Sequence, residues 1–215
     1  MMETVRTEKP LRQFLSPLWA VFAVLVLAVP GAALLWSKQP PPLDNFGPIP
    51  EFSLLDQDAK PFTRSTMTGT IWVTDFIFTR CPDICPTLSS RLATLQPQIT
   101  DHSGELPIKL LSFSVDPTYD TPEVLTSYGA QFQAMPEHWR FLTGEEPQVY
   151  ATIEGFKQVV DIQREAGLEI PDILHSQKFV LIDADGDIRG FYSSDPDGLD
   201  ALWRAASWLS DHPED

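Results

Sequence analysis

Residues 71–88 read IWVTDFIFTRCPDICPTL, and this segment is the most informative about how the chain folds. Its first half, Ile71 to Phe78, is rich in β-branched and aromatic residues, which predicts a buried strand. Its second half carries Cys81 and Cys85, the two cysteines of the chain, each followed by a proline. Proline restricts the backbone and is favoured in a first helical turn, so the sequence predicts a strand, a rigid turn with both cysteines, and a helix.

The segments downstream alternate between strand-like and helix-like periodicity. Further strands are expected at 108–115, at 139–142, and on both sides of the Asp-Gly turn in 178–192. Helices are expected over Leu88–Ile99, from Asp120 or Thr121 to Phe132 with Val124, Tyr128 and Phe132 inward, over Val149–Val160, and over Leu199–Leu209. This order predicts an α/β sandwich with a central mixed β-sheet. Dithiol enzymes of the thioredoxin type place their cysteines at such a strand end, so a thioredoxin-like sandwich is expected.

The N-terminal part contains a long apolar run. Residues 14–36 read FLSPLWAVFAVLVLAVPGAALLW and include no charged side chain, which is long enough to cross a bilayer as a helix. Arg6, Lys9 and Arg12 precede the run, which favours a cytoplasmic N-terminus and an exported body. A cleaved signal peptide is the alternative, but the run exceeds the usual apolar core of such peptides. We therefore expect a single uncleaved transmembrane anchor.

Four regions follow from these patterns. They are a cytoplasmic N-terminus at 1–13, the transmembrane anchor at 14–36, a proline-rich linker at 37–50 and one folded domain at 51–215. The net charge of the whole chain is −15. An acidic domain is not expected to bind nucleic acid.

The cysteine pair permits two kinds of chemistry. With only two cysteines there is no disulfide framework and no four-thiolate zinc site. Amides and the dipole at a helix start favour thiolate over thiol, which serves both metal binding and disulfide exchange. Two thiolates form a soft site that prefers Cu(I), with Zn(II) as the alternative. A structural disulfide or two ordinary core cysteines remain further alternatives.

A copper site needs at least one more ligand, and imidazole is the natural candidate. The chain has four histidines. His212 lies in the polar tail, His102 beside an expected helix end, and His138 before an expected strand. His175 lies just ahead of the first strand expected in 178–192, where the hairpin could bring it to the cysteine loop. Pattern alone leaves the choice of His175 open.

Four segments together resemble the Sco/SenC family of membrane-anchored, thioredoxin-like copper proteins of cytochrome c oxidase assembly. They are DFIFTRCPDICPTL, SVDPTYDTPEVLTSYG, HWRFLTG and HSQKFVLIDADGDIRGFY, and the resemblance spans about residues 46–210 in the family's order. It implies that Cys81 and Cys85 are redox-active thiolate ligands and that His175 is the imidazole ligand of a copper ion, as Cu(I), Cu(II) or both. One position departs from the family, which often has Arg where this chain has Tyr119 before Asp120.

The resemblance implies a metallochaperone rather than an enzyme. Its partners would be the dinuclear copper A site of cytochrome c oxidase subunit II and other copper chaperones. The alternative is an exported thiol–disulfide oxidoreductase that keeps copper-site cysteines reduced. No long Arg-rich presequence precedes the anchor, which favours a bacterial inner membrane with the C-terminal domain in the periplasm.

The acidic run Asp183, Asp185 and Asp187 copies the start of a calcium loop. Position six is Ile188, where glycine is needed, and position twelve is Ser194, where a bidentate glutamate belongs. A tight hairpin turn is therefore expected instead.

Overall fold

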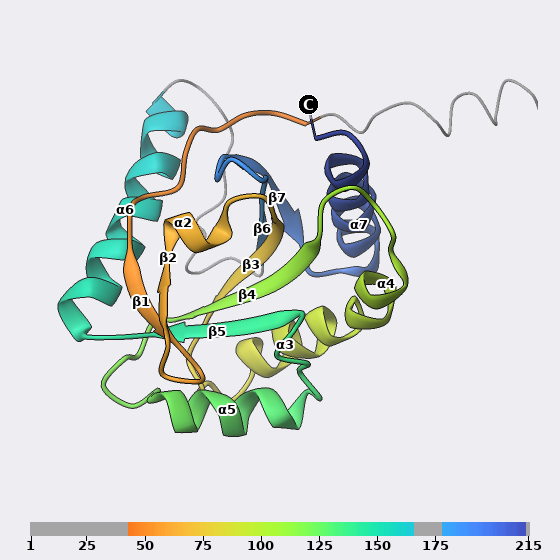
Figure 1. Cartoon of the computed structure of the whole chain (residues 1–215). Coiled ribbons are helices and arrows are strands. Elements are labelled where there is room, and N and C mark those ends of the chain that lie inside the picture. Colours follow the sequence, from red (N-terminus) through yellow and green to blue (C-terminus); the bar gives the residue numbers. More distant parts are fainter. Residues whose placement is uncertain (1–42, 166–177, 214–215) are drawn as a thin grey trace, which may run out of the picture. The chain divides into compact units, whose positions relative to one another are not determined.

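A seven-stranded mixed sheet forms the centre of the domain in the computed structural model, which describes residues 43–165 and 178–213. The strand order is β2-β1-β5-β4-β3-β6-β7. The strands are β1 (Ser53–Asp56), β2 (Pro61–Thr63), β3 (Ile71–Ile77), β4 (Ile108–Ser114), β5 (Trp139–Thr143), β6 (Lys178–Ile182) and β7 (Ile188–Ser193). Strands β3, β4 and β5 are parallel, and the outer strands pair antiparallel (Figure 1).

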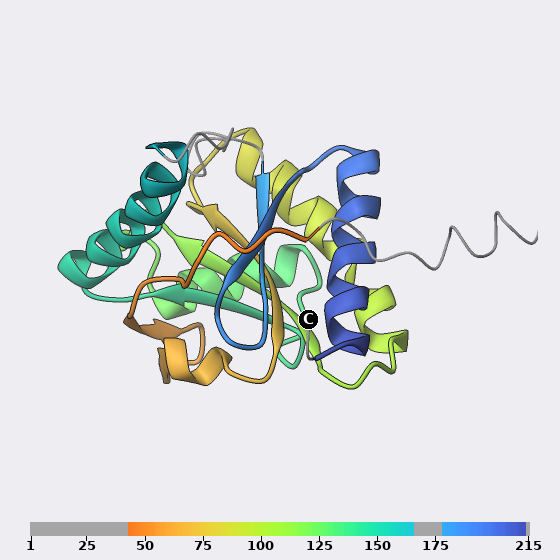
Figure 2. The same ribbon diagram turned by 90° about the horizontal axis from the view of Figure 1, so that it is seen from above.

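Helices cover both faces of the sheet (Figure 2). The helices are α2 (Arg64–Met67), α3 (Ile84–Ala93), α4 (Gln96–Asp101), α5 (Pro122–Gln131), α6 (Glu146–Glu165) and α7 (Pro196–Asp211). Helices α3, α4, α5 and α7 contribute to one apolar core, and α2 and α6 contribute to the other. The expected thioredoxin-like sandwich with a mixed sheet is therefore confirmed.

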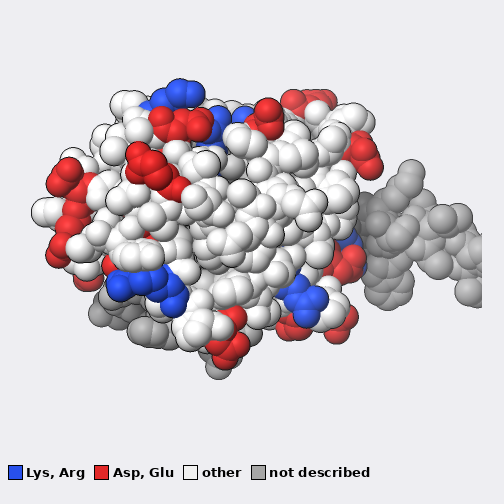
Figure 3. Space-filling view, turned by 90° about the horizontal axis from the view of Figure 1, so that it is seen from below, with Lys and Arg blue, Asp and Glu red and all other residues white. Residues whose placement is uncertain are grey.

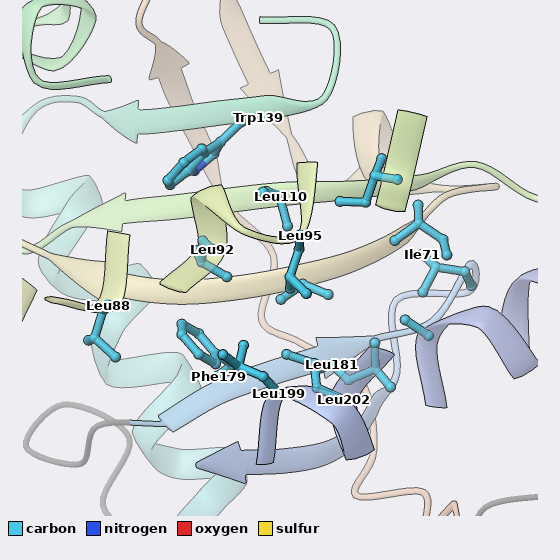
Figure 4. Packing of buried hydrophobic residues seen from close by; sticks show 14 of the residues in the cluster. Ile71, Leu88, Leu92, Leu95, Leu110, Trp139, Phe179, Leu181, Leu199 and Leu202 are labelled. Carbon is cyan, nitrogen blue, oxygen red and sulfur yellow. The ribbon is translucent and has the colours of Figure 1, made fainter. Parts of the chain in front are cut away.

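The first core lies between the sheet and helices α3 and α7 (Figure 4). Leu88 and Leu92 of α3 and Leu199 and Leu202 of α7 point toward the sheet there, and Trp139 is fully buried. Strand β3 alternates between the cores, since Ile71, Val73 and Ile77 belong to the first core and Trp72 and Phe76 to the second. Because both faces are covered, β3 is apolar throughout apart from Thr74 and Asp75.

The helix expected over Leu88–Ile99 is wrong as a single element. Helix α3 ends at Ala93 and α4 begins at Gln96, with Pro97 in the first turn of α4. Proline has no amide hydrogen, and its ring clashes with the carbonyl four residues earlier, so the helix cannot continue through this point. Leu95 and Ile99 are nevertheless buried, as their spacing predicted.

Helix α5 starts where expected, but its buried face is shifted. Thr121 caps the helix by accepting a hydrogen bond from the amide of Val124 at 3.4 Å. Tyr128 is buried as predicted, whereas Val124 and Phe132 are only half-buried and Leu125 is fully buried. The three-residue offset between Leu125 and Tyr128 therefore defines the inward face.

The Asp-Gly hairpin between β6 and β7 is confirmed. Asp183 Oδ1 accepts the amide hydrogens of Asp185 and Asp187, and its other carboxylate oxygen pairs with Arg189 at 3.1 Å. Gly186 has φ = +87°, a left-handed conformation that glycine adopts without steric cost. The carboxylate of Asp183 is thus engaged within the turn, as a hairpin requires.

The regions assigned to 1–13 and 14–36 lie outside the described residues, as do residues 37–42 of the linker assigned to 37–50. Within the described part of the chain, no helix is long and apolar enough to span a membrane. The short β1–β2 hairpin and α2 were not expected from the sequence, because strands of three or four residues give little periodicity.

Candidate metal and dithiol site

The cysteine pair lies beyond the carboxyl end of β3, the edge at which open α/β sheets usually bind ligands. Cys81 is in the turn after β3, and Cys85 is in the first turn of α3. The amide of Cys85 donates a hydrogen bond to Cys81 Sγ at 3.4 Å, so the two residues adjoin at the helix start. The position predicted from the sequence is therefore the observed one.

The two thiols have different environments. Cys81 is half-buried, and Cys85 is buried with 5% of its surface exposed. Burial acts to raise the pKa of Cys81, but hydrogen bonds from the amides of Cys85, Asp83 and Ile84 outweigh it and lower that pKa below its ordinary value. Burial raises the pKa of Cys85 to about 12, although a main-chain hydrogen bond with Phe78 opposes the shift. Cys81 is therefore the reactive and accessible thiol of the pair.

This difference predicts selective alkylation of the reduced, metal-free protein. At pH 8 we expect iodoacetamide to modify Cys81 at least about a hundredfold faster than Cys85, because Cys85 is almost entirely protonated and inaccessible. Time-resolved mass spectrometry of the labelled peptides measures both rates. Equal rates at the two cysteines would contradict the assignment of environments.

The surface beside Cys81 contains exposed apolar and aromatic side chains. Ile84, between the cysteines, is 41% exposed, and Tyr119 is 47% exposed. The Arg80 guanidinium lies 4.4 Å from the centre of the Tyr119 ring and donates from Nε to Asp116 at 3.1 Å. Tyr119, the departure from the family pattern, thus packs against the residue that precedes Cys81. The neighbouring face of the domain, over α5, is largely uncharged, with acidic and basic residues gathered at its rim (Figure 3).

The remaining described histidines do not join the cysteines. His138 precedes β5, and His102 follows α4, where Nε2 lies 2.9 Å from Ser210 Oγ. Both line a cavity of about 520 Å³ near the start of β4, at the opposite edge from the cysteines. His212 stacks on Trp208 after α7. Among the described side chains, those of 43–156 and 178–213, no three His, Cys, Asp or Glu residues are grouped to hold a metal ion, and His175 lies outside these ranges.

Two buried carboxylates near the site were not singled out from the sequence. Asp75 is fully buried in β3, on the same face as Cys85 and Tyr128, and neither of its oxygens makes a hydrogen bond with a described residue. Burial raises the pKa of Asp75 to about 7, and the nearby Ser112 hydroxyl only partly opposes the shift. A lone acidic residue within an otherwise apolar strand was the available signal.

Asp120 is the second buried carboxylate, and it follows β4. It accepts hydrogen bonds from Thr79 and Ser114. The sequence pattern indicates Asp120 only as a possible helix start.

The fold and the cysteine pair define a dithiol protein of the thioredoxin-like class, with an accessible thiol and a buried one at a strand-to-helix turn. The SCO1/SenC family model matches residues 43–209. The chain therefore belongs to the SCO1/SenC family.

Relatives and solved structures agree with this family. The chain is 30% identical over 148 residues to the SCO1 protein homolog of Bacillus subtilis, covering 67% of this chain and 73% of that protein. The structure of BsSco matches with TM-score 0.61 and 26% identity, covering 80% of this chain and 99% of that one. BsSco is a member of the Sco family of cytochrome c oxidase assembly proteins, and a disulfide switch was identified in it. Yeast Sco1 with copper bound matches with TM-score 0.54 and 26% identity over 73% and 90% of the two chains.

Proposed function

We propose that this protein binds copper through Cys81, Cys85 and His175 and supplies it to the copper A centre of cytochrome c oxidase subunit II. The observation that carries the proposal is the adjoining cysteine pair, with its accessible thiol of lowered pKa, at the ligand-binding edge of the sheet. Two thiolates are soft ligands that suit Cu(I). Yeast Sco1, a relative in fold and sequence, has been solved with copper bound, which supports copper over zinc.

The topology supports His175 as the third ligand. Strand β6 is antiparallel to β3, with Thr74 opposite Val180, so β6 begins at the sheet edge where β3 ends. His175 precedes Lys178, the first residue of β6, by three positions. Three residues of chain span at most about 10 Å, so the chain length permits an imidazole at position 175 to reach the edge that carries the cysteines.

The proposed setting is the bacterial inner membrane. The anchor at 14–36 would hold the domain in the periplasm, close to a membrane-bound oxidase. Oxidation of Cys81 and Cys85 to a disulfide would remove both sulfur ligands, so copper loading would depend on the redox state of the pair. Delivery of copper, rather than catalysis, is then the main role.

A His175→Ala variant tests the three-ligand site. We expect its Cu(I) affinity to fall by roughly 100-fold or more, since loss of a ligand should cost at least as much as loss of an outer-shell partner. Competition with a chromophoric Cu(I) chelator measures the affinity in the reduced protein. His138→Ala is the matched control, because His138 lies at the opposite edge of the sheet and should leave affinity unchanged. Equal affinities of the wild type and His175→Ala would rule out the site.

The difference between the two thiols favours a second candidate function. An accessible thiol of lowered pKa beside a buried one suits disulfide exchange, in which the first attacks and the second resolves the mixed disulfide. This function needs Cys81 and Cys85 but not His175. Two results together would favour the oxidoreductase. The His175→Ala variant would reduce oxidised subunit II at the wild-type rate, and the wild type would transfer no copper.

A further inference from the structure

Asp120 is a fully buried carboxylate that joins the ends of two parallel strands. One oxygen accepts a hydrogen bond from Ser114 Oγ at 2.6 Å, at the end of β4. Both oxygens accept from the amide of Thr79, at 3.2 and 3.3 Å, and one accepts from the Thr79 hydroxyl. Thr79 lies two residues beyond Ile77, the last paired residue of β3, and Ser114 is the last paired residue of β4. Asp120 therefore continues the connection between the strands after the regular ladder has ended.

The segment held by Asp120 lies directly before the cysteine pair and bonds to Cys81. The carbonyl of Phe78, next to Thr79, accepts the amide hydrogen of Cys81 at 3.1 Å. The side chain of Phe78 packs against the apolar core cluster to which Cys85 belongs. Phe78 and Thr79 are thus fixed by Asp120 on one side and bond to Cys81 on the other.

Asp120 is itself held in place by its own loop. Its amide donates to the carbonyl of Asp116 at 2.9 Å, and the Asp116 carboxylate pairs with Arg80. The Arg80–Asp116 pair is exposed, and exposed ion pairs contribute little. Hydrogen bonds to a buried charged group are stronger and more costly to lose. Asp120 is therefore the main attachment of the turn before Cys81.

We propose that Asp120 is the positioning residue of the cysteine pair. Through Thr79 and Phe78 it fixes where the two sulfur atoms lie relative to each other, without touching a metal ion itself. The expected effect of Asp120 on copper affinity rests on the proposed copper function, because residues that orient metal ligands without binding the metal strongly affect its affinity. It predicts that loosening Asp120 changes the cysteine site more than it changes the rest of the fold.

The test compares Asp120→Asn with Asp56→Asn in the full chain, purified in detergent and reduced. Asparagine has nearly the same shape but brings an amide hydrogen against donors that need an acceptor. Asp56 is a matched control, since it is also buried and accepts two main-chain amides, of Asp58 and Lys60, in the β1–β2 hairpin away from the cysteines. One measurement is Cu(I) affinity by chelator competition. The other is the ratio of alkylation rates of Cys81 and Cys85 in metal-free protein.

For Asp120→Asn we expect a roughly 10- to 100-fold loss of Cu(I) affinity, the range usual for outer-shell residues. We expect the ratio of alkylation rates to fall about tenfold, because Cys85 becomes more accessible once Phe78 and Thr79 are released. Asp56→Asn should leave both quantities within about twofold of the wild type, as expected for a substitution at a distant, independent site. If Asp120→Asn does not fold, Thr79→Val is used instead, since it removes only the hydroxyl that donates to Asp120 and keeps the side-chain shape. We then expect smaller changes of Cu(I) affinity and of the alkylation ratio, in the same directions.

The outcomes separate this inference from the proposed function. Folded Asp120→Asn with both quantities equal to those of Asp56→Asn overturns the positioning role, whatever the wild type binds. A wild type that fails to bind Cu(I) overturns the proposed function. The alkylation ratio then still decides the role of Asp120.

Discussion

Replacing Asp75 by asparagine is expected to stabilise the protein strongly at alkaline pH and hardly at all at acid pH. A carboxyl group with its pKa raised to about 7 binds more protons in the folded state than in the unfolded state, where its pKa is about 4. The stabilising contribution of Asp75 to the free energy of unfolding is fully present below pH 4 and is lost as the pH rises to about 7. At pH 8 the raised pKa of Asp75 lowers the free energy of unfolding by about 4 kcal/mol relative to acid pH, at about 1.4 kcal/mol for each pH unit between the two pKa values.

Asparagine removes this dependence because it is neutral at every pH and resembles the protonated carboxyl in shape. The free energies of unfolding of the wild type and Asp75→Asn should therefore be nearly equal at pH 4 and should diverge until about pH 7. Urea unfolding of the reduced proteins, followed by tryptophan fluorescence between pH 4 and 8, measures the difference.

Asp183→Asn is the control for this prediction. Asp183 is also largely buried, but it is paired with Arg189 and accepts two amides of the hairpin turn. The same substitution should there destabilise the protein at neutral pH, because a paired buried charge loses its interactions. A constant difference between wild type and Asp75→Asn across the pH range would contradict the assigned pKa.

Replacing Cys81 by serine is expected to abolish tight Cu(I) binding while leaving the fold intact. The affinity should fall by more than the roughly 100-fold that loss of an outer-shell group costs, because a thiolate ligand itself is removed. Cys81 is half-buried at the helix start, so a hydroxyl there retains access to water. Chelator competition measures the affinity, and thermal unfolding of the metal-free protein checks the fold.

Cys85→Ser should lose copper equally but should also lower the stability by about 1–3 kcal/mol, since it buries a hydroxyl in an apolar site. Thr87→Ser, on the exposed side of the first turns of α3, keeps both sulfurs and should bind as the wild type does. Tight Cu(I) binding by Cys81→Ser would exclude the cysteine pair as the metal site.

Much of the fold could be predicted because apolar periodicity follows burial. Strand β3 is apolar on both faces since two layers of helices cover it, and the 3.6-residue period of α3 and α7 matches their single buried faces. The prediction failed where local backbone chemistry breaks a period, as at Pro97 between α3 and α4. It also missed β1 and β2, because strands this short give no period. Strand β1 is held by pairing with the distant residues Leu142 and Thr143 of β5, and β2 pairs with β1.

Part of the candidate site could likewise be predicted from the sequence, and part could not. The cysteines could be located because strand end, proline and helix start are all encoded within eighteen consecutive residues. Asp120 could not be assigned its role, since Thr79, Ser114 and Asp120 come together only when β3 and β4 lie side by side. The choice of His175 came from the family resemblance, and it remains a prediction.

Local sequence patterns were sufficient to predict the order of the main strands and helices, the family, and the position of Cys81 and Cys85 at the end of a buried strand. Only the tertiary structure decided that one thiol is accessible and the other buried, that Asp75 is a buried carboxyl without a described partner, and that Asp120 holds the turn. Burial and hydrogen bonding between distant segments set these properties, and a local sequence pattern does not encode which segments pack around a side chain.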